Sequence, residues 1–195
     1  MDIPIKSSAE ASGIASLDSP RILSLVRPLP MSHSVETIHA ASKPEFYSSL
    51  HRQLTAILEG ERDWICNLAN TSALLMQSLP NLNWAGFYLL KGDELVLGPF
   101  QGKIACMRIK VGRGVCGTAA ANRASVVVPN VHEFPGHIAC DSASNSEIVV
   151  PLLHQGRLLG VLDLDSPNLG RFDNEDARGL EQMVAVLLRA SDIAS

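Results

Sequence analysis

Residues 147–165 decide the fold, and they read EIVVPLLHQGRLLGVLDLD. Two runs rich in valine, isoleucine and leucine, 147–153 and 158–165, flank the tripeptide His154-Gln155-Gly156. Apolar runs of this length, separated by a short polar segment with glycine, are typical of two neighbouring β-strands joined by a turn. The stretch therefore predicts the closing two strands of a sheet.

The second of these strands carries two acids among its apolar residues. Side chains two apart on a strand point to the same face of a sheet. Asp163 and Asp165 are thus expected on one face, together with Leu159 and Val161. The opposite face is expected to carry Leu158, Leu162 and Leu164.

The segments around this hairpin predict the rest of the fold. A helix is expected to begin at Ser42, where Glu45 three residues later resembles a capping box, and to end near Gly60. The other expected elements are a helix at 62–78, strands at 83–91, 94–97 and 105–111, a helix at 115–122, a strand at 125–129 and a helix from Asp173 to 190. This order favours an α+β fold, a single domain whose central, largely antiparallel sheet is flanked by helices.

Length and composition limit the classes of function. The 195 residues suit one domain, residues 43–195, preceded by a flexible N-terminal extension, residues 1–42, that is rich in Ser, Pro and Ala. The net charge of −4 argues against nucleic-acid binding, which requires a basic surface. No apolar run approaches the ~20 residues of a membrane span, so we expect a soluble protein without a membrane partner.

Cysteine usage points to thiol chemistry. The chain has four cysteines and no secretory signal, so a cytoplasmic location is expected and a disulfide-stapled scaffold is not. Cys140 lies in a long loop, residues 130–146, beside the polar residues Asp141 and Ser142. Loops of this length inside a domain are uncommon unless they serve a function. Cys140 is therefore the candidate functional thiol.

Carboxylates and aromatic rings form a second candidate set. Two like charges in a buried strand are costly unless a cation joins them, and a ligand ammonium group would relieve Asp163 and Asp165. The alternative is that this strand end is solvated. Glu147 opens the neighbouring strand and adds a third acid. Trp84 and Tyr88 share a strand face and suit a methyl-bearing ligand, although ordinary core packing explains most aromatic strands.

These residues resemble a known family. From about residue 42 to 190 the chain looks like a free methionine-R-sulfoxide reductase, a stand-alone GAF-domain enzyme. The matching stretches are NWAGFY at 83–88, GPFQG at 98–102, GRGVCGT at 112–118, IACD at 138–141, SEIVVP at 146–151 and GVLDLD at 160–165. Three cysteines, Cys106, Cys116 and Cys140, match as a spaced set.

The resemblance implies a redox cycle on free L-methionine-(R)-S-oxide. It makes Cys140 the nucleophile and Cys106 the resolving thiol that forms a disulfide with it, and it leaves the share of Cys116 in resolution open. It assigns substrate binding to Trp84, Tyr88, Glu147, Asp163 and Asp165. Thioredoxin or a similar dithiol would restore the thiols. No organic cofactor or metal is implied, and Cys66 is expected to be a core thiol.

Two other functions compete with this hypothesis. GAF domains commonly sense small ligands, but sensing does not require three spaced thiols. A zinc site could use Cys106, Cys116, His137 and Cys140, although paired CxxC motifs are missing. The sequence leaves open the physiological reductant, the role of residues 1–42 and the oligomeric state, with a homodimer as one alternative.

Overall fold

A six-stranded sheet forms the centre of the computed structural model, which describes residues 35–138 and 142–193. The strands are β1 (Trp84–Lys91), β2 (Glu94–Gly102), β3 (Arg108–Lys110), β4 (Val126–Val128), β5 (Ser146–His154) and β6 (Arg157–Ser166). Their order across the sheet is β3-β2-β1-β6-β5-β4, and every neighbouring pair is antiparallel. The predicted α+β fold with an antiparallel sheet is confirmed.

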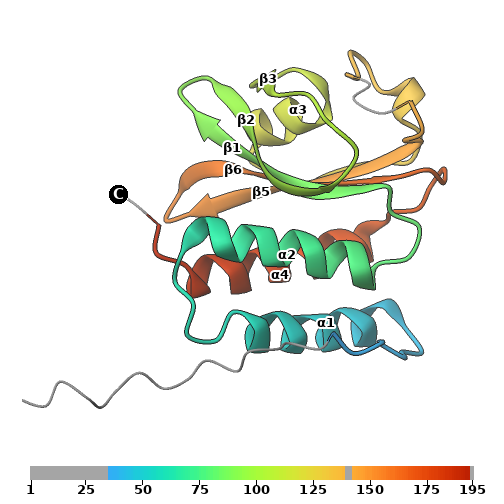
Figure 1. Ribbon diagram of the computed structural model, residues 1–195. Helices are drawn as coiled ribbons and strands as arrows, with labels where there is room; N and C mark the ends of the chain where they lie inside the picture. The colour runs from blue at the N-terminus through green and yellow to red at the C-terminus, as the bar shows by residue number, and fades with distance from the viewer. Residues whose placement is uncertain (1–34, 139–141, 194–195) are drawn as a thin grey trace, which may run out of the picture. The chain divides into compact units, whose positions relative to one another are not determined.

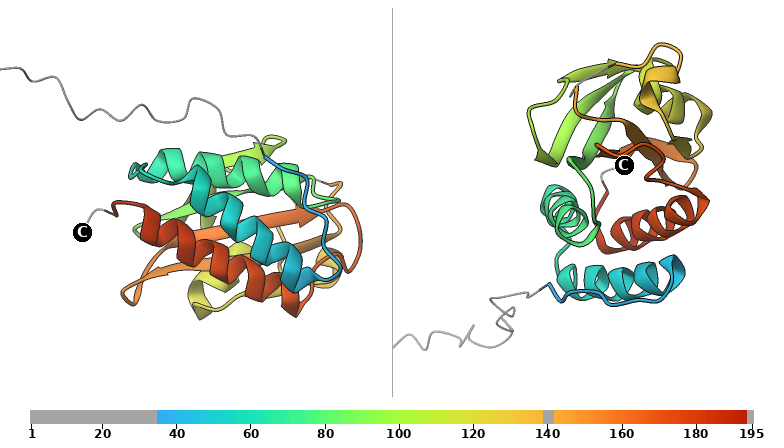
Figure 2. Two further views of the ribbon diagram at one scale, coloured as in Figure 1. Left: turned by 90° about the horizontal axis from the view of Figure 1, so that it is seen from below. Right: turned by 90° about the vertical axis from the view of Figure 1, so that its right-hand side faces the viewer.

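Helices cover both faces of this sheet. They are α1 (Lys43–Ile57), α2 (Trp64–Ser78), α3 (Gly114–Asn122) and α4 (Asn174–Ala190). Figure 1 shows α2 and α4 side by side against one face, with α1 packed beneath them as a further layer. The same three-helix stack is visible end-on in Figure 2. The short α3 lies on the opposite face with the segment that follows β4, and this second face holds the candidate site.

Local capping sets where three helices begin. The side chain of Ser42 accepts a hydrogen bond from the amide of Glu45, as the sequence predicts, and so fixes the start of α1. Asp173 caps α4 in a capping box with Asp176. Asp63 caps α2, and for this reason the helix begins at Trp64 rather than at residue 62.

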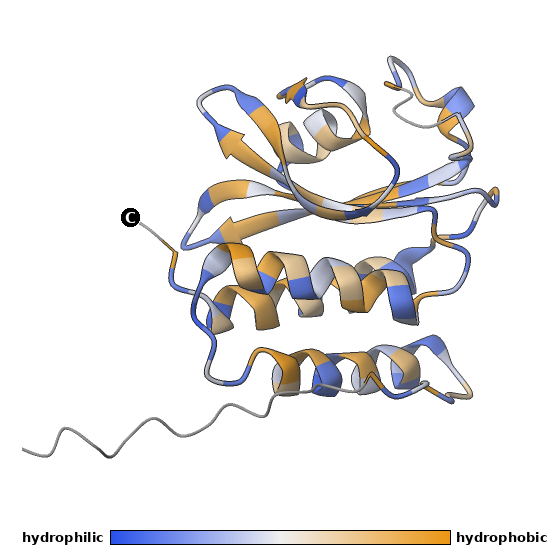
Figure 3. Cartoon of the chain, in the orientation of Figure 1, coloured by the Kyte–Doolittle hydropathy of each residue, from blue (hydrophilic) through white to orange (hydrophobic). Residues whose placement is uncertain are grey.

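The main core lies between the sheet and α1, α2 and α4. Figure 3 shows apolar residues gathered along this interface. Val35 and Ile38 pack against the core although they belong to the predicted flexible extension. The rest of that extension, residues 1–34, lies outside the described residues. All the described elements belong to one compact unit.

One prediction about strand faces is wrong because β6 contains a bulge. The β5–β6 register shifts between Leu152, opposite Gly160, and Leu153, opposite Leu158. Leu158 therefore packs on the site face with Val161, and Leu159 packs on the helix face, the reverse of the expected alternation. Gly160 has φ of 157°, and a Cβ there would lie 2.2 Å from the carbonyl oxygen of Tyr88.

Two further details differ from the sequence prediction. β2 is longer than the expected 94–97, because it pairs with β1 from Glu94 to Gly102. β3 is shorter than the expected 105–111, because it pairs only with the first three residues of β2. Within the described part of the chain, no helix has the length and apolar character needed to cross a membrane.

Candidate active site

Three neighbouring strands place the candidate site residues in rows. Trp84 on β1 lies opposite Asp165 on β6, and Asp165 lies opposite Glu147 on β5. In the next row Asp163 stands between Gly86 and Val149. Residues that are paired across antiparallel strands share a face, so an aromatic ring and three acids point away from α2 and α4.

Helix α3 brings a thiol onto this row of acids. Cys116 in its first turn is buried, and its Sγ atom lies 3.9 Å from Oε1 of Glu147. One ligand atom each from Cys116, Glu147 and Asp163 lie within 4.8 Å of one another. The sheet therefore supplies the acids and α3 covers them.

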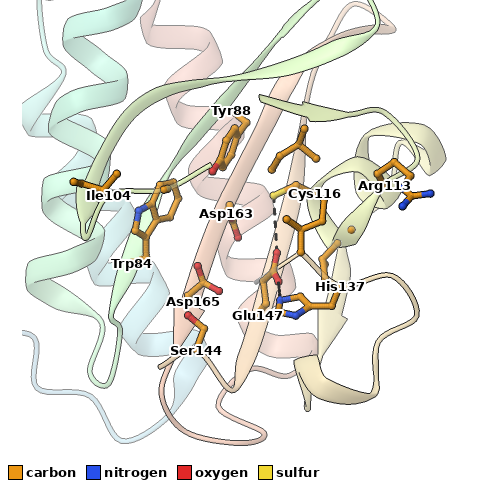
Figure 4. A pocket seen from close by; sticks show the side chains of 15 residues that line it. Trp84, Tyr88, Ile104, Arg113, Cys116, His137, Ser144, Glu147, Asp163 and Asp165 are labelled. Carbon is orange, nitrogen blue, oxygen red and sulfur yellow. Dashed lines mark hydrogen bonds and ion pairs between the residues drawn. The ribbon is translucent and has the colours of Figure 1, made fainter. Parts of the chain in front are cut away.

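These groups line a single pocket (Figure 4). Its floor is formed by the acids and the aromatic strand β1, and α3 forms one wall. The segment after β4 contributes His137, Ile138 and Ser144, and the segment after β2 contributes Ile104 and Ala105. Segments far apart in the sequence thus converge on one small cavity.

An aromatic wall closes the β1 side of the pocket. The ring of Trp84 stacks on Phe100, with centroids 5.3 Å apart, and on Tyr88, with centroids 5.9 Å apart. The indole Nε1 donates a hydrogen bond to the carbonyl of Lys103, at 3.1 Å. A Cβ at position 86 would lie 2.3 Å from Phe100 Cβ, so glycine is required for this stacking. The indole is therefore held in one fixed orientation.

Burial favours the protonated form of two acids of the pocket, Glu147 and Asp163. Desolvation, followed by the charges of Asp163 and Asp165, raises the pKa of Glu147 well above its ordinary value. Desolvation also raises the pKa of Asp163 to about 7, although hydrogen bonding to Cys116 and Glu147 acts in the opposite direction. Oδ1 of Asp163 is buried and has no hydrogen-bond partner among the described residues.

The thiol and the imidazole respond to the same environment. Burial and the neighbouring acids raise the pKa of Cys116, so it stays a thiol near neutral pH. His137 Nε2 lies 3.7 Å from Oε2 of Glu147, while burial and the charge of His132 lower the pKa of His137. The contact between His137 and Glu147 thus joins two predominantly neutral groups and is not a strong ion pair.

The structure brings most of the predicted site residues together. Trp84, Tyr88, Cys116, Glu147, Asp163 and Asp165 all line the pocket. Cys106 is disulfide-bonded and lies beside the pocket residues Ile104 and Ala105 in the chain. Cys140 lies outside the described residues. Cys66, predicted as a core thiol, is exposed and free, because α2 turns this side of its first turn to solvent.

Sequence reasoning missed several pocket residues. His137 was considered only as a metal ligand, yet it contacts Glu147. The hydroxyl group of Ser144 accepts a hydrogen bond from the side-chain amide (Nδ2) of Asn83, and this bond ties the loop to the start of β1. Arg113 lines the pocket beside α3. The short spacing from His137 to the candidate thiol was the available signal for that residue, whereas the Asn83–Ser144 contact spans 61 residues and leaves no local pattern.

The donor set does not match the zinc site considered from the sequence. A disulfide sulfur is no thiolate ligand, so Cys106 is not offered to a metal ion. Within the described residues, the grouping able to ligate a metal is Cys116, Glu147 and Asp163. These groups belong to the pocket described above.

Comparison with known proteins assigns the domain and then the family. Residues 56–190 match the family model of the GAF domain, and this segment contains all six described strands, so the chain contains a GAF domain. The free methionine-R-sulfoxide reductase of Escherichia coli K12 is 59% identical over 146 residues, which is 75% of this chain and 88% of that protein. The chain belongs to the free methionine-R-sulfoxide reductase family.

Further relatives agree in sequence and in structure. The free methionine-R-sulfoxide reductase of Saccharomyces cerevisiae is 42% identical over 154 residues, covering 75% of this chain and 86% of that protein. The structure of the Neisseria meningitidis free methionine-R-sulfoxide reductase in complex with its substrate superposes with a TM-score of 0.77 at 45% identity. That match covers 82% of this chain and 95% of the other.

Proposed function

We propose that this protein reduces free L-methionine-(R)-S-oxide to L-methionine through a cycle of cysteine thiols. The observation that carries the proposal is the pocket itself. It joins a fixed indole ring to three acids, two of them buried with raised pKa values, in a chain 59% identical to the Escherichia coli reductase. A neutral carboxyl group that can donate a proton is what reduction of a sulfoxide requires.

The charges of the pocket suit the positive end of a free amino acid. Asp163 and Asp165 lie side by side on β6, and Oδ1 of Asp163 has no hydrogen-bond partner among the described residues. The ammonium group of the substrate would supply that partner and would offset the cost of burying Asp163 next to a second acid. The methyl group of the substrate would pack on the ring of Trp84, which stacks on Tyr88.

The first half of the cycle transfers oxygen to the enzyme. The thiolate of Cys140 forms a bond to the sulfoxide sulfur, and Glu147 protonates the sulfoxide oxygen as a general acid. The hydroxyl group then moves from the substrate sulfur to the sulfur of Cys140, so the S–O bond of a sulfenic acid forms on Cys140. The S–O bond of the substrate and the bond between the two sulfurs break, and methionine leaves as the reduced thioether. The high pKa of Glu147 keeps its proton available at neutral pH.

The second half restores the thiols. The thiol of Cys106 displaces the oxygen from Cys140 as water, so two thiols and one sulfoxide yield a disulfide, a thioether and water. Cys106 is disulfide-bonded and Cys116 is a buried free thiol with a raised pKa, which supports Cys106 as the resolving residue. A dithiol, thioredoxin or a close equivalent, then reduces the disulfide by exchange. The cycle requires no organic cofactor or metal.

The surface beside Cys106 suits a protein reductant. Ile104 is 91% exposed and Met107 is 77% exposed, and both flank Cys106 in the chain. Large apolar side chains exposed together are typical of protein interaction sites. Exchange with thioredoxin also requires a reducing compartment, which agrees with the predicted cytoplasmic location. The homodimer stays a prediction that sedimentation analysis would test.

The decisive experiment measures methionine released from each epimer of free methionine sulfoxide. We expect turnover of the R epimer with thioredoxin, thioredoxin reductase and NADPH, and little turnover of the S epimer. Cys140→Ser should abolish release, whereas Cys106→Ser should release roughly one equivalent and then stop. Undiminished turnover by Cys140→Ser would refute the proposed chemistry.

A further inference from the structure

A buried thiol and two buried carboxyl groups meet beneath helix α3. Cys116 is 3% exposed, and Glu147 and Asp163 are each 6% exposed. One ligand atom from each of these three side chains lies within 4.8 Å of the other two. The proposed reaction uses the two acids and gives the thiol of Cys116 no step of its own. The cluster therefore has a chemical capacity that the proposed cycle does not use.

The spacing of these atoms suits a tetrahedral metal ion. Sγ of Cys116 lies 3.9 Å from Oε1 of Glu147. With Zn–S and Zn–O bonds of about 2.3 and 2.0 Å, a tetrahedral zinc ion holds a sulfur and an oxygen ligand roughly 3.5 Å apart. A small side-chain adjustment therefore brings both atoms within bonding distance of one ion.

An independent observation on Asp163 points to a cation at the same place. Its Oδ1 atom is buried and accepts no hydrogen bond within residues 35–138 and 142–193. Figure 4 shows the carboxyl group of Asp163 inside the pocket, between Trp84 and Cys116. Buried polar atoms are generally paired, and an ion is one of the partners that satisfies them. A cation held by Cys116 and Glu147 would lie within reach of this oxygen.

The donor types favour zinc over the hard cations. Thiolate sulfur suits zinc, whereas Mg²⁺ and Ca²⁺ prefer six or more oxygen ligands. Burial and the neighbouring acids raise the pKa of Cys116, but a bound metal ion deprotonates a coordinating thiol outright. Zinc binding would therefore release the proton of the thiol, and those of the carboxyl groups, to the solvent.

We propose that Cys116, Glu147 and Asp163 bind a single Zn²⁺ ion, which blocks the pocket. Three protein ligands leave the fourth tetrahedral position to a water molecule. His137 Nε2 lies 3.7 Å from the other carboxylate oxygen, Oε2 of Glu147, where it can orient the ligating carboxylate. The ion would lie between α3 and the sheet and would join β5, β6 and the helix.

A bound zinc ion would inhibit the proposed reaction, and this consequence rests on the proposed function. Oδ1 of Asp163 would bind zinc in place of the ammonium group of the substrate. Glu147 would lose the proton that it donates to the sulfoxide oxygen. Zinc and substrate would therefore exclude one another, and turnover would depend on the concentration of free zinc.

Titration of the oxidised protein with Zn²⁺ tests the site directly. Cys106 is disulfide-bonded in this form, and the free thiols among the described residues are Cys66 and Cys116. Cys66 is exposed on α2, which covers the other face of the sheet (Figure 1), so it provides a matched control of the same residue type. Isothermal titration calorimetry measures the affinity and the number of zinc ions per chain.

The expected result is one Zn²⁺ ion per chain, held through Cys116. Cys116→Ser should weaken binding at least 10- to 100-fold, because losing a ligand costs more affinity than losing a group that only orients one. Cys66→Ser should bind zinc as the wild type does. A wild type that binds no zinc, or a Cys116→Ser protein that binds it equally well, would overturn the inference.

Cobalt adds a spectroscopic check on the thiolate. Co²⁺ occupies tetrahedral zinc sites, and a thiolate ligand gives it a charge-transfer band in the near ultraviolet. The band should be present in wild type and Cys66→Ser and absent from Cys116→Ser. If circular dichroism shows that Cys116→Ser does not fold, Asp163→Asn decides, since an amide is less costly to bury than a carboxylate. Unchanged zinc affinity in Asp163→Asn would also overturn the inference.

The binding and activity measurements fail independently. A protein that reduces methionine-R-sulfoxide and binds no zinc keeps the proposed function and loses the metal site. A protein that binds zinc and reduces no sulfoxide keeps the metal site and loses the function. If both hold, single-turnover release of methionine should stop at saturating Zn²⁺ and recover when EDTA removes the ion. Undiminished release at saturating Zn²⁺ would overturn the inhibition.

Discussion

The two faces of the sheet use the same strands for opposite purposes. On the helix face, β1, β5 and β6 carry a set of apolar residues that are at most 1% exposed: Ala85, Phe87, Ile148, Val150, Leu162 and Leu164. On the other face, alternate residues of the same strands are Trp84, Tyr88, Glu147, Asp163 and Asp165. One face stabilises the domain, and the other places polar groups where they are costly.

This difference shows on which face of the sheet the chain tolerates unfavourable burial of polar groups. The continuous apolar core between sheet and helices supplies stability, since burial of apolar surface contributes about 25 cal/mol per Å². Glu147 and Asp163 on the site face are buried and have raised pKa values, which reduces stability at neutral pH. We therefore expect the functional residues of the site face to reduce the stability of the domain, and the apolar residues of the helix face to supply it.

The largest effect is expected when an acid is moved to the helix face. Leu162→Asp would bury a lone carboxylate among α2, α4 and the sheet, and we expect a loss of about 4 kcal/mol or more in the free energy of unfolding. Asp163→Leu, one residue along, should fold and lack activity. Urea unfolding followed by circular dichroism checks both. A stable, cooperative Leu162→Asp protein would contradict the assigned roles of the faces.

The next effect concerns the proposed general acid. Glu147→Gln keeps the shape of the side chain and removes its proton donor, so we expect kcat for free methionine-R-sulfoxide to fall about 100- to 10,000-fold. Glu94→Gln, whose carboxylate pairs with Arg108 on the surface, serves as the matched control. Single-turnover release of methionine provides the measurement, and a rate within twofold of wild type would remove Glu147 from this role.

A smaller effect should appear in stability as a function of pH. Burial raises the pKa of Asp163 from an ordinary 3.8 to about 7, so the folded state binds its proton more tightly than the unfolded state. The stability of the wild type is therefore highest, with respect to this group, below pH 4 and decreases as pH rises to about 7. Asp163→Asn should be more stable than wild type at pH 8, by about 1 to 4 kcal/mol.

That gain should nearly vanish at pH 3.5, below both pKa values, where the carboxyl group is mostly neutral in both states. Urea unfolding of the two proteins at pH 3.5 and pH 8 gives the comparison. Glu147, whose raised pKa acts in the same direction, is present in both proteins. An advantage of the variant that does not change with pH would show that titration of Asp163 is not its cause.

The smallest effect is expected at the indole ring. Trp84→Phe keeps an aromatic ring against Phe100 and loses the hydrogen bond from Nε1 to Lys103. We expect KM to rise about 3- to 10-fold, as for the loss of one hydrogen bond with some loss of packing. Trp64→Phe, on α2 against the helical core, is the control and should leave KM unchanged.

Much of the fold could be predicted because its determinants are local. The capping residues Ser42 and Asp173 directly precede the helices that they start, and each bonds to an amide at most three residues away. The expected β-hairpin 147–165 forms β5 and β6. The shared face of Asp163 and Asp165 followed from strand geometry alone. The exchanged faces of Leu158 and Leu159 could not be predicted from strand geometry, because the bulge at Gly160 depends on the close approach of the backbone of β1.

The site could be predicted less completely for a related reason. The acids and Trp84 could be predicted from the sequence, because each differs in type from the other residues of its own strand. The contact of Cys116 with Glu147 could not be predicted, because it joins a helix to a strand residue 31 positions away. The contact of His137 with Glu147 likewise depends on how a loop returns over the sheet. Such pairings arise from tertiary structure and only a three-dimensional view reveals them.

Asn145 gives the pocket loop a property of its own. Its carbonyl accepts from the amide of Val131, and its side chain contacts His132 and the carbonyl of Pro167. These hydrogen bonds join the two ends of the loop, at residues 131–132 and at Asn145, to each other and to the turn after β6. Insertions or deletions between these two ends would alter the rim of the pocket and leave the sheet beneath unchanged. Related chains are therefore free to diversify their specificity in this loop without losing the fold.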